Sequence, residues 1–290
     1  MPSINILGVP HHYELTGPEC VASRPVLIYI HGWLLSRHYW QPLVQQLSTD
    51  YPCLTYDLRG FGDSQTETLA TSADQALSPF SLAAYARDLI LLLEQLHITQ
   101  AWLVGHSLGG SIALWAAKAC PERVQGVVCL NAGGGIYLKE EFERFRTMGQ
   151  RLVSFRPPWL ATLPLLDLLF ARLMVEKTLA RPWGRQRIQD FVRADAAAAL
   201  GSLLESTTEE EVHLLPQLVA QLSQPVYFLA GQKDMVMESK YVNYLASFHS
   251  LFYPMGQNVI EIPDCGHFAM LEQTQIVVEK MNYILRTSGF

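Results

Sequence analysis

The stretch Val104-Gly105-His106-Ser107-Leu108-Gly109-Gly110 decides the fold of this 290-residue chain. An apolar run at 101–104 precedes it, and an alanine-rich helical pattern at 111–119 follows it. A Gly-x-Ser-x-Gly pattern between a strand and a helix is typical of a sharp turn that lifts its serine above a sheet. The glycines allow the close backbone approach that such a turn requires. We therefore expect Ser107 to stand exposed at the start of a helix.

Buried strands separated by helices extend from this stretch in both directions. Apolar runs of strand length predict strands that are buried on both faces of a parallel sheet, at 25–30, 52–57, 101–106, 124–130 and 225–230. Helical patterns occupy 38–47, 81–96, 108–119, 238–248 and 271–286, with one more strand at 258–262. This alternation predicts an α/β fold with a mostly parallel central sheet flanked by helices.

The alternation of strands and helices stops after residue 133 and resumes near residue 225. Between these points the pattern is helical, with helices expected at 140–153, 188–204 and 209–222 and an apolar stretch at 159–175. We therefore predict an α/β core in two parts, 1–133 and 219–290, with an all-helical lid or cap at 134–218.

Composition narrows the class of protein. An apolar fraction of 49% is ample for a large core, and a net charge of −6 without a basic block argues against nucleic-acid binding. Five cysteines, an odd number without CxxC spacing, favour reduced, mostly buried thiols over disulfides or a zinc site. The first ten residues lack the features of a signal peptide. We expect a cytoplasmic protein with no metal and no cofactor.

Two further side chains are needed to activate the hydroxyl of Ser107. A serine hydroxyl needs a base to take its proton, usually a histidine that a carboxylate holds in one tautomer. His267 follows the last predicted strand, and Asp234 follows the strand at 225–230. Loops at the carboxyl ends of parallel strands gather at one edge of the sheet. The order Ser107, Asp234, His267 is that of nucleophile-elbow enzymes, so we predict these three residues as a catalytic triad.

Acyl transfer also requires hydrogen-bond donors for the oxyanion of the tetrahedral intermediate. One donor is the backbone N–H of Leu108, at the positive end of the following helix. The other should come from the loop after the strand at 25–30, where Gly32 permits a tight turn. We predict the backbone N–H of Trp33 as this second donor.

Each of these assignments has an alternative. Ser107 could be an ordinary turn residue, Asp234 a turn or helix-cap residue, and His267 a structural histidine. The rival acid is Asp264, but three residues before His267 on the same turn it is poorly placed to orient the ring. The placement of three independent residues on one sheet edge favours the triad.

Two more histidines flank the predicted site. His31 precedes Gly32, and His106 precedes the nucleophile. We expect both to order loops rather than to react.

The chain resembles the α/β-hydrolase fold superfamily, in particular its serine esterase and lipase-like branch with a helical lid. The stretches 31–33, 57–64 and 105–110 carry the resemblance, together with the loops of Asp234 and His267. It covers nearly the whole core, whereas the lid contains no motif that we recognise.

The resemblance implies the same residues in the same roles: Ser107, Asp234 and His267 as triad, Trp33 and Leu108 as oxyanion donors. Related epoxide hydrolases and haloalkane dehalogenases carry aspartate at the position of Ser107, so the serine argues against both chemistries. Some family members carry the acid after the strand at 124–130. This chain has Asn131 there, which is no rival to Asp234.

The main hypothesis is therefore a serine hydrolase that cleaves a small-molecule carboxylic ester through an acyl-enzyme on Ser107. A second is a lyase or C–C bond hydrolase that uses the same triad on a small anionic metabolite. Lid arginines would then bind carboxylates, with Arg181, Arg185, Arg187 and Arg193 as candidates. A third is a non-catalytic binding module on this fold.

The lid stretch at 159–174 is richer in apolar residues than a cap needs for its own packing. We expect a lipophilic acyl or alcohol group in the substrate, or docking of the lid at a membrane surface. An alternative of equal weight is that these residues only pack the lid on the core. No motif marks the residues that bind substrate, and none indicates an oligomeric state.

Overall fold

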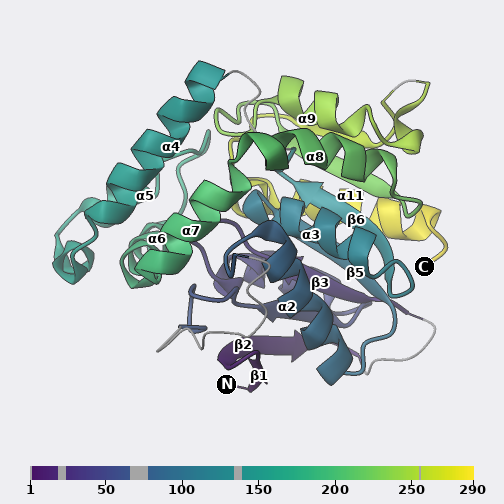
Figure 1. Ribbon diagram of the computed structural model, residues 1–290, viewed down its shortest axis with the longest axis horizontal. Helices are drawn as coiled ribbons and strands as arrows, with labels where there is room; N and C mark the ends of the chain where they lie inside the picture. The colour runs from purple at the N-terminus through teal and green to yellow at the C-terminus, as the bar shows by residue number, and fades with distance from the viewer. Residues whose placement is uncertain (1, 19–23, 66–77, 134–138, 255) are drawn as a thin grey trace.

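The computed structural model describes residues 2–18, 24–65, 78–133, 139–254 and 256–290. Its centre is an eight-stranded sheet in the order β1-β2-β4-β3-β5-β6-β7-β8 (Figure 1). Strands β3 to β8 are parallel, whereas β1 and β2 are antiparallel to their neighbours. The strands are β1 (Ser3–Ile6), β2 (Val9–Thr16), β3 (Val26–Ile30), β4 (Cys53–Tyr56), β5 (Ala101–His106), β6 (Val124–Leu130), β7 (Val226–Gly231) and β8 (Val259–Ile262).

The central strands are apolar along their whole length because both of their faces are covered. Every residue of β3 and β5 is buried. In β5, Leu103 packs into one apolar layer, whereas Trp102 and Val104 pack into the other. The parallel register pairs Ile30 with Gly105 and His106 with Leu130. Strands β3, β5 and β6 therefore end at the same edge of the sheet, where their loops meet.

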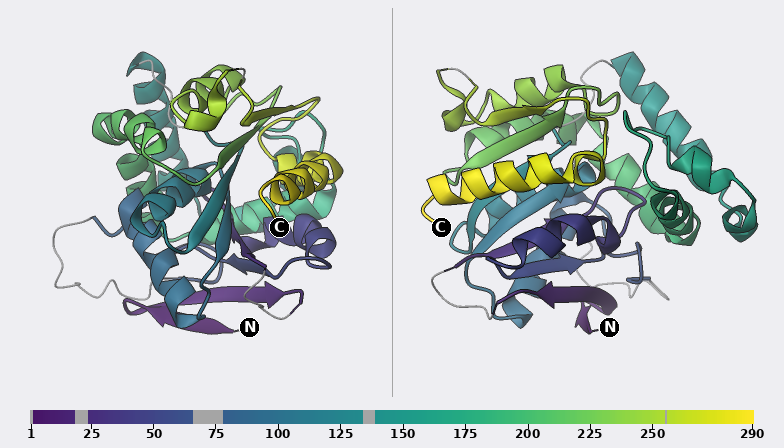
Figure 2. Two further views of the ribbon diagram at one scale, coloured as in Figure 1. Left: turned by 90° about the vertical axis from the view of Figure 1, so that its right-hand side faces the viewer. Right: turned by 180° about the vertical axis from the view of Figure 1, so that it is seen from behind.

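Helices cover both faces of the sheet (Figure 2). One layer contains α2 (Leu82–Gln95), α3 (Leu108–Ala119), α8 (Glu209–Ala220) and α9 (Ser239–Ala246). The other layer contains η1 (Arg37–Trp40), α1 (Gln41–Leu47), α10 (Ala269–Glu272) and α11 (Thr274–Thr287). The predicted α/β architecture, a mostly parallel sheet flanked by helices, is confirmed.

Helices also make up the described residues between β6 and β7, apart from their connecting loops. They are α4 (Lys139–Ser154), η2 (Pro158–Thr162), α5 (Leu166–Phe170), α6 (Arg181–Arg193), α7 (Ala196–Ser206) and α8. The single helix predicted at 188–204 was wrong. Asp195 starts a new helix there, because its side chain accepts a hydrogen bond from the amide of Ala198 and caps α7.

Helix α8 packs on α3 and α9, and its residues Leu215, Leu218 and Val219 belong to the apolar layer on that side of the sheet. Helices α4 and α5 lie out to one side of the sheet (Figure 1). The division into a core and a lid at 134–218 stays a prediction. The packing of α8 favours a lid that ends before residue 209.

Four cysteines are free and buried, namely Cys53, Cys120, Cys129 and Cys265, as their number and spacing predict. Cys20 lies outside the described residues. Within the described residues, no helix has both the length and the hydropathy needed to cross a bilayer.

Candidate active site

The turn at Ser107 joins the end of β5 directly to the start of α3. Ser107 has φ 51° and ψ −120°, a conformation that residues with a side chain rarely adopt. A Cβ atom on Gly105 would lie 2.2 Å from the carbonyl oxygen of Gly109. A Cβ atom on Gly109 would lie 2.2 Å from that of Ile30. Only glycine fits at these two positions, and the tight packing that results holds the half-buried Ser107 at the sheet edge.

His267 and Asp234 meet across two neighbouring loops, after β8 and β7 respectively. The Nδ1 atom of His267 lies 2.8 Å from Oδ2 of Asp234, and their side chains are 6% and 0% exposed. Because an ionised carboxylate only accepts hydrogen bonds, Nδ1 carries the proton and Nε2 of the neutral ring remains free to act as a base. The rival acid Asp264 is exposed, whereas Asp234 is the carboxylate bonded to His267.

Four hydrogen bonds hold the carboxylate of Asp234. Besides His267, its donors are the amides of Val236 and Met237, at 2.8 and 3.0 Å, and Nδ2 of Asn131, at 3.0 Å. Burial by itself raises the pKa of Asp234. The charge that His267 carries when it is protonated, together with the hydrogen bonds from His267, Met237 and Val236, outweighs burial and lowers that pKa to about 2. The carboxylate is therefore ionised at neutral pH.

Asn131 is a site residue that sequence reasoning missed. Its fully buried side chain donates from Nδ2 to Asp234 and to the carbonyl oxygen of Gly266, at 2.9 Å. Its Oδ1 atom accepts from the amide of Ala269, at 3.2 Å. Asn131 thus ties the end of β6 to the loops of both Asp234 and His267. Its place directly after a buried strand, level with Ser107, was the signal that could have revealed this role.

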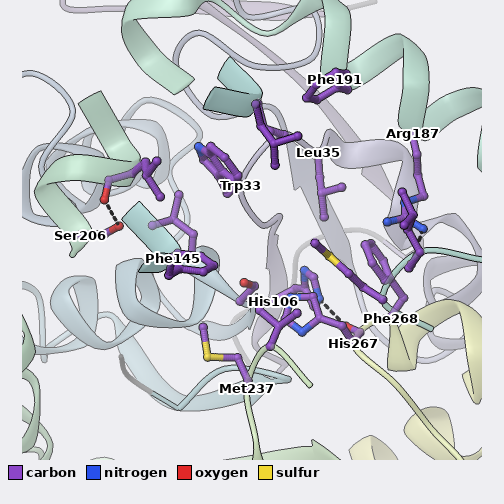
Figure 3. A pocket seen from close by; sticks show the side chains of 18 of the residues that line it. Trp33, Leu35, His106, Phe145, Arg187, Phe191, Ser206, Met237, His267 and Phe268 are labelled. Carbon is purple, nitrogen blue, oxygen red and sulfur yellow. Dashed lines mark hydrogen bonds between the residues drawn. The ribbon is translucent and has the colours of Figure 1, made fainter. Parts of the chain in front are cut away.

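His106 and His31 order loops around Ser107, as expected. The Nε2 atom of His106 donates to the carbonyl oxygen of His267 at 2.7 Å, and burial lowers the pKa of His106 to about 3 (Figure 3). His31 donates from Nδ1 to the carbonyl oxygen of Gly32 and accepts at Nε2 from the amide of Leu58. Burial also lowers the pKa of His31. Both rings are therefore uncharged at neutral pH, and their hydrogen bonds hold the surrounding loops in place.

The two predicted oxyanion donors lie beside the serine. Leu108 is the first residue of α3, so its amide is at the positive end of the helix. A Cβ atom on Gly32 would lie 3.2 Å from Cβ of Ser107, so the turn that carries Trp33 approaches Ser107 closely. Trp33, Leu108 and Ser107 line the same cavity.

This cavity has a volume of about 240 Å³, and both Ser107 and His267 line it. Figure 3 shows His267 among the side chains around it. The walls of the cavity are mainly apolar and come from core loops and from the helices and turns between β6 and β7. The latter contribute Phe145, Leu152, Phe170, Leu173, Met174, Phe191 and Leu203. Among the described residues that line it, Arg187 is the only lysine, arginine, aspartate or glutamate.

Three of the four candidate arginines pair with carboxylates. Arg181 and Arg185 lie 2.6 and 3.6 Å from Oδ2 of Asp167. Arg193 lies 3.1 Å from Oδ1 of Asp63 and so joins α6 to the loop after β4. All three side chains are more than half exposed, at 55%, 65% and 58%. None of the three lines the cavity.

Arg187 is different, because it is buried and faces the cavity (Figure 3). Its Nη1 atom donates to the carbonyl oxygens of Phe170 and, at 2.8 Å, Leu173. Its guanidinium lies 4.3 Å from the centre of the Phe268 ring. Burial lowers the pKa of Arg187 to about 10, so it remains charged at neutral pH.

In the part of the chain that the structure describes, no cluster of His, Cys, Asp and Glu side chains is arranged to hold a metal ion.

Comparison with known families matches residues 25–274 to the family described as the alpha/beta hydrolase fold. The chain belongs to this α/β-hydrolase fold family. The resemblance to the α/β-hydrolase fold superfamily is thereby confirmed, and so is the core fold that it implied.

Relatives within the α/β-hydrolase fold family carry two kinds of name. The chain is similar to the uncharacterized hydrolase YugF of Bacillus subtilis, with 25% identity over 92% of this chain and 90% of that protein. It is 32% identical to a 2-succinyl-6-hydroxy-2,4-cyclohexadiene-1-carboxylate synthase of Yersinia pseudotuberculosis, over 81% of each.

Among solved structures, an esterase from Thermogutta terrifontis matches with a TM-score of 0.76 and 22% identity over 100% of both chains. The family and its hydrolase-named members support an enzyme that acts on a small molecule.

Proposed function

We propose that this α/β-hydrolase is a serine hydrolase that cleaves a carboxylic ester through an acyl-enzyme on Ser107. The observation that carries the proposal is the pairing of His267 with the ionised Asp234 at the cavity that Ser107 also lines. That pairing leaves Nε2 of His267 as the only nitrogen of the ring that can accept a proton.

In the first half of the reaction, Nε2 of His267 takes the hydroxyl proton of Ser107 while Oγ attacks the carbonyl carbon of the ester. The amides of Leu108 and Trp33 stabilise the oxyanion that forms, and one such donor contributes about 10²–10³-fold in rate. The intermediate collapses, the C–O bond to the alcohol breaks, and the alcohol leaves with the proton from His267. Ser107 remains acylated.

In the second half, His267 takes a proton from a water molecule, which attacks the acyl carbon. Collapse of the second intermediate breaks the bond to Ser107, and the proton returns to Oγ. The ionised Asp234 stabilises the imidazolium that forms in each half. The complete cycle consumes the ester and one water molecule and releases the alcohol and the carboxylic acid.

The walls of the cavity support a lipophilic acyl or alcohol group in the substrate. Aromatic and aliphatic side chains from the helices between β6 and β7 face the space next to Ser107. Burying a hydrocarbon chain against such walls contributes roughly 0.8 kcal/mol for each CH₂ group. We include in the proposal that helices α4 to α7, residues 139–206, form the lid that selects this group.

Labelling with a fluorophosphonate probe and hydrolysis of p-nitrophenyl esters test the proposal. Ser107→Ala should abolish both. Ser111→Ala is the matched control, because Ser111 lines the same cavity one helical turn further along α3 and should retain both. A folded wild-type protein that stays unlabelled and cleaves no ester would instead be a binding module on this fold. A strong preference for acetate esters over esters of long acyl chains would overturn the proposal that the substrate carries a lipophilic group.

A lyase or C–C bond hydrolase acting on a small anionic metabolite is the second candidate. Arg187 favours it, because this buried cation lines the cavity and pairs with no carboxylate among the described residues. A relative is also named as a synthase. Probe labelling of Ser107 without turnover of any ester in a panel would favour this candidate over the first.

A further inference from the structure

Exposed apolar side chains are concentrated on one part of the molecule. Of the eighteen large apolar side chains that are exposed among the described residues, ten lie between 148 and 174. Soluble proteins rarely expose so many such side chains together unless the surface binds something. We define the lid patch as Met148, Leu152, Phe155, Trp159, Leu163, Leu165, Leu168, Leu169, Leu173 and Met174.

The lid patch reaches the mouth of the cavity. Leu152, Leu173 and Met174 are exposed at the surface and also line the cavity that contains Ser107. An apolar surface in contact with the patch would therefore lie next to the opening through which a substrate enters. This continuity separates the patch from the scattered surface leucines that are normal on soluble proteins.

The chain around the lid patch is basic. Residues 144–193 contain ten lysines and arginines against three acids, a formal charge of +7, whereas the whole chain carries −6. Two of those acids are buried, namely Asp190 and Asp167, and Asp167 pairs with Arg181 and Arg185. The basic side chains that are exposed are Arg144, Arg151, Arg172, Lys177, Arg181, Arg185 and Arg193.

Basic and apolar side chains share the same surfaces. On α4, the spacing of Arg144, Met148, Arg151 and Leu152 places them on one face of the helix. Arg172 immediately precedes Leu173 of the patch, and both are exposed. This combination fits the interface of an anionic bilayer, where apolar side chains enter the acyl boundary and basic ones meet the headgroups. A second copy of the chain fits poorly, because two positive patches repel each other.

We propose that the lid patch docks on anionic lipid bilayers and so presents the mouth of the cavity to the lipid surface. Trp159, which is 53% exposed, then lies at headgroup depth, where indole rings are enriched. The lipophilic ester enters from the bilayer rather than from water. Only this last step rests on the proposed function, since docking requires no turnover.

Binding to vesicles tests docking with the full chain. Vesicles of phosphatidylcholine mixed with phosphatidylglycerol should bind the protein at low ionic strength more strongly than phosphatidylcholine alone, and added NaCl should weaken that binding. Arg172→Gln should weaken the partition coefficient about fivefold, because a basic residue at an anionic surface contributes about 1 kcal/mol. Lys118→Gln is the matched control, since Lys118 is an exposed cation on α3, outside the patch.

The contribution of the apolar side chains to docking is tested with Trp159→Asp and Leu165→Asp, both at exposed positions. Each should lower vesicle binding at least tenfold. Tyr283→Asp on α11 is the control, because it introduces the same charge at a side chain that is 61% exposed on an element away from α4 and α5 (Figure 1). Equal binding to both vesicle types, or unchanged binding of the patch variants, would overturn the proposal.

Two further measurements distinguish docking on lipid from dimer formation and from a failure of the ester reaction. Sedimentation of the free protein should give a monomer, and a dimer that Leu165→Asp dissociates would make the patch an interface between copies instead. Turnover of an ester embedded in vesicles should fall in the patch variants, whereas turnover of a short soluble ester should not. If no ester is cleaved, the ester reaction fails, while vesicle binding still decides docking.

Discussion

Replacing Asp234 by asparagine removes one negative charge and changes which nitrogen of His267 carries the proton. Oδ1 of Asp234 accepts from the amides of Val236 and Met237, so the amide oxygen of the new side chain must face them. Its NH₂ group then faces Nδ1 of His267. Nδ1 has to accept, and the proton moves to Nε2. A ring in this tautomer cannot take the proton of Ser107.

The expected loss of activity follows from the wrong tautomer and is about 10⁴-fold in kcat. The change in stability follows from the pKa of Asp234, which the fold lowers from the ordinary 3.8 to about 2. At about 1.4 kcal/mol for each pKa unit, the ionised carboxylate stabilises the fold by about 2 kcal/mol. Because the pKa is lowered, this contribution is present above pH 4 and is lost as the pH falls towards 2.

Hydrolysis of a p-nitrophenyl ester measures the activity of Asp234→Asn, and urea unfolding at pH 7 and at pH 3 measures its stability. The stability deficit relative to wild type should be larger at pH 7. Asp264→Asn is the control, because Asp264 is the exposed rival acid and its variant should behave as wild type. An Asp234→Asn variant that retains activity within tenfold of wild type would refute the orienting role of this carboxylate.

Three further predictions address the oxyanion loop, the contact of α6 with the core, and Arg187. Gly32→Ala places a Cβ atom 2.7 Å from Nδ1 of His106, so the loop of Trp33 must shift, and kcat should fall about 10²–10³-fold with little change in KM. An unchanged kcat would argue against Trp33 as a donor. Burial raises the pKa of Asp190 to about 7, although the hydroxyl of Ser36 donates to it at 2.9 Å. Because this pKa is raised, stability should be lost as the pH rises from 4 through 7, by up to about 4 kcal/mol, and Asp190→Asn should flatten this slope in urea unfolding. Parallel stability curves would contradict this. Arg187→Gln should lower kcat/KM about tenfold to hundredfold for esters whose acyl chain ends in a carboxylate, and not for neutral esters of equal length. The exposed Arg181→Gln is its control, and equal losses on both kinds of ester would exclude anion recognition.

Much of the core could be predicted because its signals are local. A strand that is buried on both faces must be apolar throughout, so β3 and β5 appear in the sequence as unbroken runs. The turn at Ser107 is also local, since Gly105 and Gly109 are required by contacts within and beside it. The pairing of His267 with Asp234 was predictable because parallel strands bring their carboxyl ends to one edge.

Other features depend on contacts between distant segments and leave little trace in the sequence. Asn131 acts through hydrogen bonds to residues more than a hundred positions away. Asparagine is common in turns and loops of every kind, so its role emerges only once the three loops are assembled. The separation of Arg187 from the other three arginines likewise depends on which carboxylates lie opposite α6. The break between α6 and α7 was a local signal, since Asp195 is a good helix cap, but the surrounding helical pattern concealed it.

Strands β6 and β7 are hydrogen-bonded neighbours, with Val127 paired to Val226, although the segment from 131 to 225 separates them in the chain. Helix α8 already provides the crossover that two parallel strands require. The entropy of closing a loop changes by only about 0.6 kcal/mol when its length doubles. Helices α4 and α5 pack mainly on α7 and α6 rather than on the sheet, so they can lengthen, shrink or be exchanged at little cost to it. Helices α6 and α7 are instead tied to the core, through Asp190 and Ala198 respectively. Under the proposed function, α4 and α5 are therefore the part of the chain through which evolution or an engineer can change the substrate while the proposed triad of Ser107, Asp234 and His267 is kept.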